Sequence, residues 1–180
     1  MARARRRETL PAERPREIVS GETCLYLGRQ YRLRLRASPE VRPLTLRAGW
    51  LELPVPPSMA GPQQAAYARA ALMDWYTKRA REHLPVWAEE WAQKAGVELR
   101  DVRIADQAKR WGSCSKGVLR LNWRILQAPR RLVDYVVAHE VVHVLHEHHG
   151  AEFWAALGML IPDYEARRER LRVLGRELVW

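Results

Sequence analysis

Residues 139–149 read His-Glu-Val-Val-His-Val-Leu-His-Glu-His-His, and these side chains are of the types that bind a metal ion and move protons. His139 and His143 are four residues apart, so on a helix they project from one face. Glu140 lies about 100° round the helix axis from His139 and points toward the same space. Two such imidazoles can hold zinc while the carboxylate takes a proton from zinc-bound water. The segment therefore predicts a metal-dependent hydrolase.

A histidine-rich helix can also form for packing alone, or bind metal without catalysis. The preceding residues favour a functional site. Leu132 and Val136 continue into His139 and His143 with helical spacing, so the histidines extend the buried face of an apolar helix. Buried polar groups need partners, and a metal ion supplies them.

His149, six residues after His143, is the predicted third ligand. On a straight helix it would lie about 15 Å along the axis from His139, so the helix is expected to end near residue 147, with Gly150 permitting a bend. His146 would lie about 10 Å further along the same face than His139, and His148 is expected to point elsewhere. The carboxylate alternatives are Glu147, Glu152, Asp163 and Glu165.

The segments around this helix are predicted from periodicity. Residues 22–56 predict antiparallel strands, with a hairpin turn at Ala48-Gly49. Residues 63–95 predict a helix that breaks or restarts at Pro85. Strands are expected at 97–104 and, as a hairpin turning at residues 116–117, at 110–115 and 118–123; short helices follow at 151–161 and from residue 162. The expected buried face of the long helix comprises Ala65, Ala66, Ala70, Ala71, Trp75 and Tyr76.

Length and charge limit the classes of protein. A chain of 180 residues predicts one compact domain with a small N-terminal lobe. The net charge is +10, and residues 1–17 predict a disordered basic tail, which we interpret as solubilising rather than as binding nucleic acid phosphates. No apolar run is long enough for a membrane span or a secretory signal. Cys24 and Cys114 are too few for a disulfide scaffold, so both are expected to be reduced in a cytoplasmic protein.

Five motifs occur in order between roughly residues 18 and 175: R-W-G-S-C-S (110–115), L-N-W-R (121–124), D-Y-V-V-A-H-E-V-V-H (134–143), H-G-A-E-F-W (149–154) and P-D-Y (162–164). Together they resemble the YgjP-like metallopeptidase family, which is similar to the SprT-like zincins. The resemblance implies an α+β fold, with a small antiparallel β region at 18–58 and a zincin-like catalytic domain at 59–180 that holds the hairpin and the H-E-x-x-H helix. It implies zinc held by His139, His143 and His149, with Glu140 as general base. The family usually has Asn where this chain has His148, and Ser in place of Gly150.

The function predicted from these features is zinc-dependent peptide hydrolysis. The resemblance suggests Arg110, Trp111 and Tyr164 as substrate-binding residues, and an edge strand of the hairpin is expected to pair with an extended peptide. Cys114 is interpreted as a packed residue. One alternative is a metal-dependent nucleoside triphosphate pyrophosphatase acting on UTP, an activity assigned to YgjP-like proteins, although the chain lacks a phosphate-binding G-x-x-x-x-G-K-[ST] loop and a carboxylate cluster for Mg²⁺. The other is a zinc-stabilised nucleic-acid-binding protein. Oligomeric state is left open.

Overall fold

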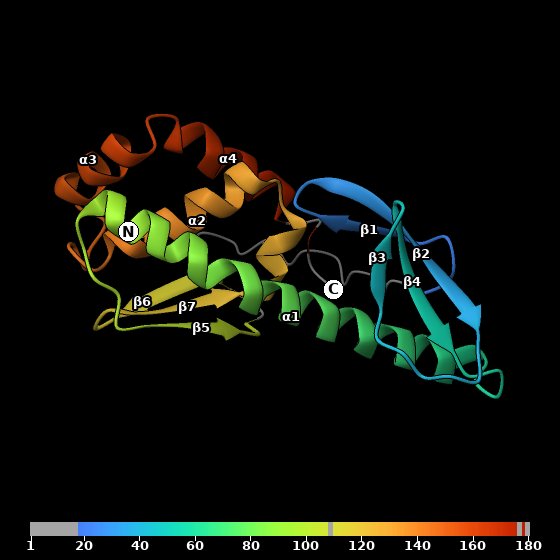
Figure 1. Cartoon of the computed structure of the whole chain (residues 1–180). Helices are drawn as coiled ribbons and strands as arrows, with labels where there is room; N and C mark the ends of the chain where they lie inside the picture. Colours follow the sequence, from blue (N-terminus) through green and yellow to red (C-terminus); the bar gives the residue numbers. More distant parts are fainter. Residues whose placement is uncertain (1–17, 108–109, 176–177, 179–180) are drawn as a thin grey trace, which may run out of the picture.

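The computed structural model describes residues 18–107, 110–175 and 178, so the expected basic tail at 1–17 lies outside it. Figure 1 shows a long helix, α1 (Gly61–Ala95), that passes two small sheets in turn. The first sheet lies beside the N-terminal half of α1, and the second lies beside its C-terminal half (Figure 1). Helices and sheets in one chain confirm the predicted α+β class.

The first sheet contains β1 (Thr23–Tyr26), β2 (Arg29–Ala37), β3 (Thr45–Arg47) and β4 (Trp50–Val55), in the order β1-β2-β4-β3. The predicted β3–β4 hairpin is confirmed: its turn residues have φ values of 47° and 84°, as a mirror-image two-residue turn requires. The expectation of a wholly antiparallel region is wrong, because β2 runs parallel to β4. The hairpin sets its second, longer strand against β2, where Leu51 and Leu53 pair with Leu33 and Leu35.

Helix α1 is continuous for 35 residues, and the predicted break at Pro85 is wrong. Proline removes one backbone hydrogen bond at a cost of about 3 kcal/mol or more. Here the carbonyl deprived of its partner belongs to Arg81, which is exposed, so water can hydrate it. Leu84, next to the proline, and Ala88, three residues after it, are fully buried, and this packing holds the helix together across the proline. The helix ends at Ala95 and is capped by Gly96, whose φ of 67° lies in the left-handed region that glycine adopts at little cost.

The buried face of α1 differs from the expected one. Trp75 and Tyr76 are buried as predicted, but Ala66 and Ala70 are exposed. Ala66 lies about 180° round the helix from Trp75, so the two cannot share a face. The large aromatic side chains determine which face is buried, and the residues that share it are Ala68, Leu72 and Ala80.

The second sheet contains β5 (Asp101–Ala105), β6 (Gly112–Ser115) and β7 (Val118–Asn122), in the order β5-β7-β6. The predicted hairpin is present as β6 and β7, with positive φ at Lys116 and Gly117. The strand expected from residue 97 begins only at Asp101, and it pairs parallel to β7. Strand β6 is therefore the edge strand of the sheet on the hairpin side.

A 3-10 turn, η1 (Trp123–Gln127), leads into α2 (Arg130–Val142), which is followed by α3 (Ala151–Leu160) and α4 (Tyr164–Leu174). Helix α2 packs against α1, β6, α3 and α4, so it lies at the centre of the second half of the molecule. It ends five residues before the expected position near 147. None of the described helices is both long and apolar enough to cross a membrane.

One hydrophobic core joins the two halves, with buried residues from both sheets and from all four α-helices. The Tyr76 hydroxyl donates to the Leu25 carbonyl over 2.5 Å, and the Leu27 N–H donates to the Leu126 carbonyl over 2.7 Å. Cys24 is buried in this core and Cys114 is half-buried, and the two form no disulfide bond. The turn between β1 and β2 thus reaches the segment just before α2.

Candidate metal centre

The chain reverses direction after α2, and that reversal determines where the third histidine lies. The last turn of α2 tightens, since the N–H of Val144 bonds to Val141 and the N–H of Leu145 bonds to Val142. Gly150 was expected to permit the bend, but its φ of −79° is open to any residue and its Cβ position is free. The reversal therefore needs no glycine at position 150. It comes from the tightened end of α2 and the bends before His149.

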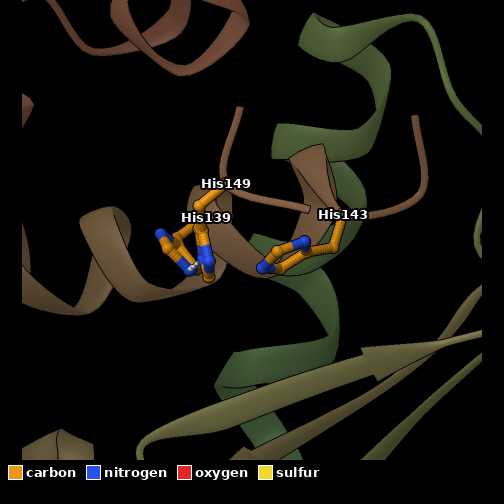
Figure 2. A group of neighbouring side chains, drawn as sticks. All are labelled: His139, His143 and His149. Atoms are coloured by element: carbon orange, nitrogen blue, oxygen red, sulfur yellow. Dashed lines mark hydrogen bonds between the residues drawn. The ribbon is translucent and has the colours of Figure 1, made fainter. Parts of the chain in front are cut away.

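The three predicted histidines come together in space. Their ligand-capable ring nitrogens all lie within 4.8 Å of one another, and the Nε2 atoms of His139 and His149 are 3.0 Å apart. Figure 2 shows the rings of His139 and His149 close together, with the ring of His143, at the C-terminal end of α2, pointing toward them. Two nitrogens on one tetrahedral zinc ion lie roughly 3.3 Å apart, given bonds of about 2.0–2.1 Å. Small side-chain shifts would therefore bring all three to ligand distance.

Helix α3 supplies the wall behind these rings. The Phe153 ring is fully buried, with its centroid 4.9, 4.6 and 4.7 Å from those of His139, His143 and His149. Trp154 stacks on His149 at 5.5 Å, and its Nε1–H donates to the His149 carbonyl over 3.1 Å. The motif that follows His149 in sequence therefore fixes the backbone and the ring of that residue.

Burial and neighbouring positive charges favour the neutral, metal-binding form of His139 and His149. Burial, the neighbouring histidines and Arg168 lower the pKa of His139 to about 3. The pKa of His149 is also lowered, first by burial and then by His143 and His148. His143 pairs through Nδ1 with the His146 carbonyl at 2.9 Å, and donation from Nδ1 leaves Nε2 free as a ligand. Ring nitrogens that keep a free lone pair at pH 7 can bind a metal ion.

The donor set also fits a catalytic rather than a structural metal. Three imidazoles leave one position of a tetrahedral ion open. Among the described residues, no other group of His, Cys, Asp or Glu has metal-binding spacing. The alternatives considered from sequence are engaged or remote: Asp163 pairs with Arg131 and Arg167, each at 2.8 Å, and Glu152 lies 3.6 Å from His146. His148 is exposed and outside the cluster.

Glu140 is the buried acid of the site, with 7% of its surface exposed. Burial raises its pKa to about 7, and the positive charge of Arg110 opposes that rise. Strand β6 passes so close that a Cβ on Gly112 would lie 2.7 Å from the Glu140 Cγ and 2.9 Å from its Oε1. The glycine of the R-W-G-S-C-S motif therefore makes room for the Glu140 side chain.

A cleft of about 260 Å³ opens beside Glu140 and His139. Its walls come from Trp111 and Gly112, from α2 and from α4. Of the predicted substrate-binding residues, Trp111 lines the cleft and Arg110 is exposed next to it. Tyr164 lies outside the cleft wall and stacks on Trp154 at 5.4 Å.

Four residues that line this cleft were not predicted as site residues from the sequence: Gly112, Tyr135, Arg168 and Arg172. Tyr135 precedes His139 by one helical turn, so its position on the same face could have been read from spacing. Arg168 carries no such signal, because it comes from α4 and lies among several other arginines of that helix.

Three convergent imidazoles beside a buried carboxylate are typical of metal-dependent hydrolases. The chain belongs to the YgjP-like family: residues 1–173 match the family described as YgjP-like, metallopeptidase domain. Membership of a metallopeptidase family implies a divalent metal, and the histidine cluster can hold one.

Comparison with solved structures finds some similarity to the metallopeptidase zymogen of Pyrococcus abyssi abylysin. The identity is 20% and the TM-score 0.45, over 52% of this chain and 93% of the other. That likeness is too slight to support an inference about the site. No curated protein matches the chain significantly.

Proposed function

We propose that this metallopeptidase is a zinc-dependent peptidase in which His139, His143 and His149 hold the ion and Glu140 is the general base. The observation that carries the proposal is the convergence of the three ring nitrogens next to a buried carboxylate. An all-nitrogen set of three ligands suits zinc, which accepts tetrahedral sites with one open position.

Zinc would supply a Lewis acid that polarises the scissile carbonyl and acidifies water. The protein itself contributes the proton carrier. Burial raises the pKa of Glu140 to about 7 in the metal-free protein, and a bound cation would lower it, so Glu140 would be ionised beside zinc and could accept a proton from the attacking water. Once protonated, the same group can donate to the leaving amine. The apolar surroundings that raise the pKa therefore match the acid to both steps.

The edge position of β6 supports a peptide substrate. Strand β6 carries Gly112 against Glu140, and β7 occupies only one of its sides within the sheet. An extended peptide can add to such an edge through backbone hydrogen bonds. Its scissile bond would then run past the Glu140 carboxylate, and a neighbouring side chain would enter the cleft.

The test combines metal analysis with peptide hydrolysis on purified full-length protein. Wild type is expected to hold one zinc per chain, and Glu140→Gln should keep that zinc while losing about 10²–10⁴-fold in kcat. His149→Ala should lose most of the zinc. Glu147→Gln, an exposed acid in the same segment, is the matched control and should resemble wild type. Full activity in Glu140→Gln would contradict the proposed base.

Measuring UTP turnover in the same preparations distinguishes the nucleoside triphosphate pyrophosphatase alternative from the peptidase. A UTP activity that needs zinc and disappears in His139→Ala would belong to this site rather than to a contaminant. The nucleic-acid alternative depends on residues 1–17, which lie outside the described part of the chain.

A further inference from the structure

We infer that the cleft beside Glu140 binds a substrate carboxylate next to the scissile bond, and that Arg168 recognises it. The inference rests on the proposed peptidase function and adds a substrate class to it. It makes Arg168 a specificity-determining residue, supplied by α4 rather than by the helix that carries the histidines.

The size and walls of the cleft fit one amino-acid side chain. Its volume of about 260 Å³ lies below the roughly 300–1,000 Å³ of pockets that enclose drug-sized ligands. Val136 and Leu171 form buried apolar parts of the wall, with 4% and 6% of their surfaces exposed. Electrostatic attraction is stronger beside such apolar surface than in open water.

The charge in the cleft comes from two arginines of α4 that differ in pairing. Arg172 is bound by both oxygens of Glu169, at 2.6 and 2.8 Å, so its charge is compensated. Arg168 is exposed, and among the described residues no carboxylate lies within ion-pair distance of it. The described residues that line the cleft therefore present one uncompensated guanidinium, whose paired N–H groups match the two oxygens of a carboxylate.

The position of Arg168 places that charge beside the metal centre. Its guanidinium lies 5.2 Å from the centre of the Trp154 ring, and that ring stacks on His149. Trp154 also lies 6.2 Å from His139, measured between ring centres. An anionic side chain held by Arg168 would consequently belong to a residue close to the bond being cut.

A nucleoside triphosphate fits these features less well than a carboxylate does. Its phosphates carry several negative charges, and phosphoryl-transfer sites meet them with several cations or metal ions. Among the described residues that line the cleft, Arg168 is the one arginine without a carboxylate partner, and the cleft volume is small. One carboxylate balances that charge.

The experiment measures selectivity with zinc-loaded full-length protein and fluorogenic peptides in matched pairs. Glu and Gln are compared at the residue before and the residue after the cleavage site, and a free C-terminus is compared with an amide. Wild type is expected to prefer the carboxylate in kcat/KM by about tenfold to a hundredfold at one of these positions. A preference for Glu over Gln would show that the bound carboxylate is a side chain, and a preference only for the free C-terminus would show that it is the terminal carboxylate. Either result supports the inference.

Variants of α4 then assign the preference to one residue. Arg168→Gln should bring the Glu-to-Gln ratio to about 1, and Arg168→Glu should reverse it in favour of a Lys peptide over its Gln counterpart. Arg168→Lys should keep part of the preference. Arg170→Gln removes an exposed arginine of the same helix that does not line the cleft, and it should keep the wild-type ratio.

Binding provides a readout that does not depend on turnover. Calorimetry with zinc-loaded Glu140→Gln should give a lower Kd for the Glu peptide than for the Gln peptide, and adding Arg168→Gln should remove the difference. Equal Kd values before that second change would overturn the inference, whether or not peptides are cleaved. Cleavage of neutral and acidic peptides at equal rates would support the proposed peptidase function but overturn the inference that Arg168 recognises a carboxylate. Zinc-dependent UTP turnover lost in Arg168→Gln, with a flat peptide ratio, would also overturn it in favour of phosphate.

Discussion

The two ends of α2 are built differently. At the N-terminal end, Asp134 accepts hydrogen bonds from Arg130 at 2.9 Å and from Trp91 of α1 at 3.3 Å. Arg130 also lies over the Trp87 ring at 3.6 Å. At the C-terminal end, burial shifts the pKa of both His139 and Glu140 away from the ordinary values. The contacts at the N-terminal end of α2 stabilise the fold. This stability offsets the cost of burying the polar side chains of His139 and Glu140 at the C-terminal end.

A glycine allows close approach at each end, but to different neighbours. A Cβ on Gly28, in the β1–β2 turn, would lie 2.8 Å from the Pro129 backbone Cα just before α2. A Cβ on Gly112 would meet the side chain of Glu140 instead. Gly28 also has a positive φ of 78°, whereas Gly112 has an ordinary φ. Substitution at the first should therefore cost mainly stability, and substitution at the second mainly activity.

The largest expected effect is that of Gly28→Ala, which should lower the free energy of unfolding by about 2–5 kcal/mol. Overpacking against rigid backbone accounts for about 1–3 kcal/mol, and the left-handed conformation adds roughly 1–2 kcal/mol. Denaturant titration measures the change. Gly49→Ala is the matched control, since Gly49 has a similar φ of 84° with open space around it. Equal losses in both variants would show that the contact with Pro129 contributes nothing.

Gly112→Ala should reduce kcat about 100-fold while zinc is retained, because displacing a catalytic group by about 1 Å costs this much. The Glu140 side chain has to move to admit the methyl group. Peptide hydrolysis and metal analysis on the same samples measure the effect. Gly150→Ala, which adds a methyl group in open space, should leave both unchanged. Wild-type kcat in Gly112→Ala would mean that the position of Glu140 does not depend on β6.

Glu140→Gln should raise the free energy of unfolding of the metal-free protein by about 2 kcal/mol at pH 8. The pKa of Glu140 rises on folding from 4.5 to about 7, so its contribution to stability is complete below pH 4.5 and is lost as the pH rises through 7. A shift of that size corresponds to at most about 3 kcal/mol, and burying the amide offsets part of the gain.

Unfolding titrations of both proteins between pH 4 and pH 8, with a chelator present, measure this difference. The lowered pKa of His139 acts equally in both proteins, so subtraction removes most of its effect. A difference that does not shrink toward acid pH would contradict the assigned cause.

The smallest effect is expected from Trp91→Phe, which should cost about 1 kcal/mol of unfolding free energy. It removes the Nε1–H donor to Asp134 and keeps most of the ring, while Arg130 continues to bind the same carboxylate. Thermal unfolding measures the loss, and peptide hydrolysis should not change. A drop in activity comparable to that of Gly112→Ala would mean that the two ends of α2 are not separable.

The parts of the site that were predictable from sequence are those set by local geometry. The helical period places His139, Glu140 and His143 toward one space, and it requires a reversal before His149 can join them. Two-residue turns at residues 48–49 and 116–117 were predictable for the same reason, since few residue pairs adopt positive φ.

The remaining features depend on contacts between distant segments. Pro85 lies inside a helix because Leu84 and Ala88 are buried by neighbours that no local pattern identifies. The parallel pairing of β2 with β4 and the approach of Gly112 to Glu140 arise only once the sheets pack. Arg168 reaches the cleft because α4 folds against α2, and residue spacing along α4 does not encode that.

The continuous helix α1 has a consequence for how the molecule comes apart. Its first half is covered by the first sheet, where Tyr26 meets Trp75 at 5.0 Å and Leu25 accepts the Tyr76 hydrogen bond. Its second half supports α2 through Trp91. Because both halves of the molecule pack on this one continuous helix, we expect them to unfold in a single cooperative transition. A chain shortened to residues 59–180 would expose Trp75 and Tyr76 of α1 to water. The resulting loss of stability would extend through α1 and α2 to the histidine cluster.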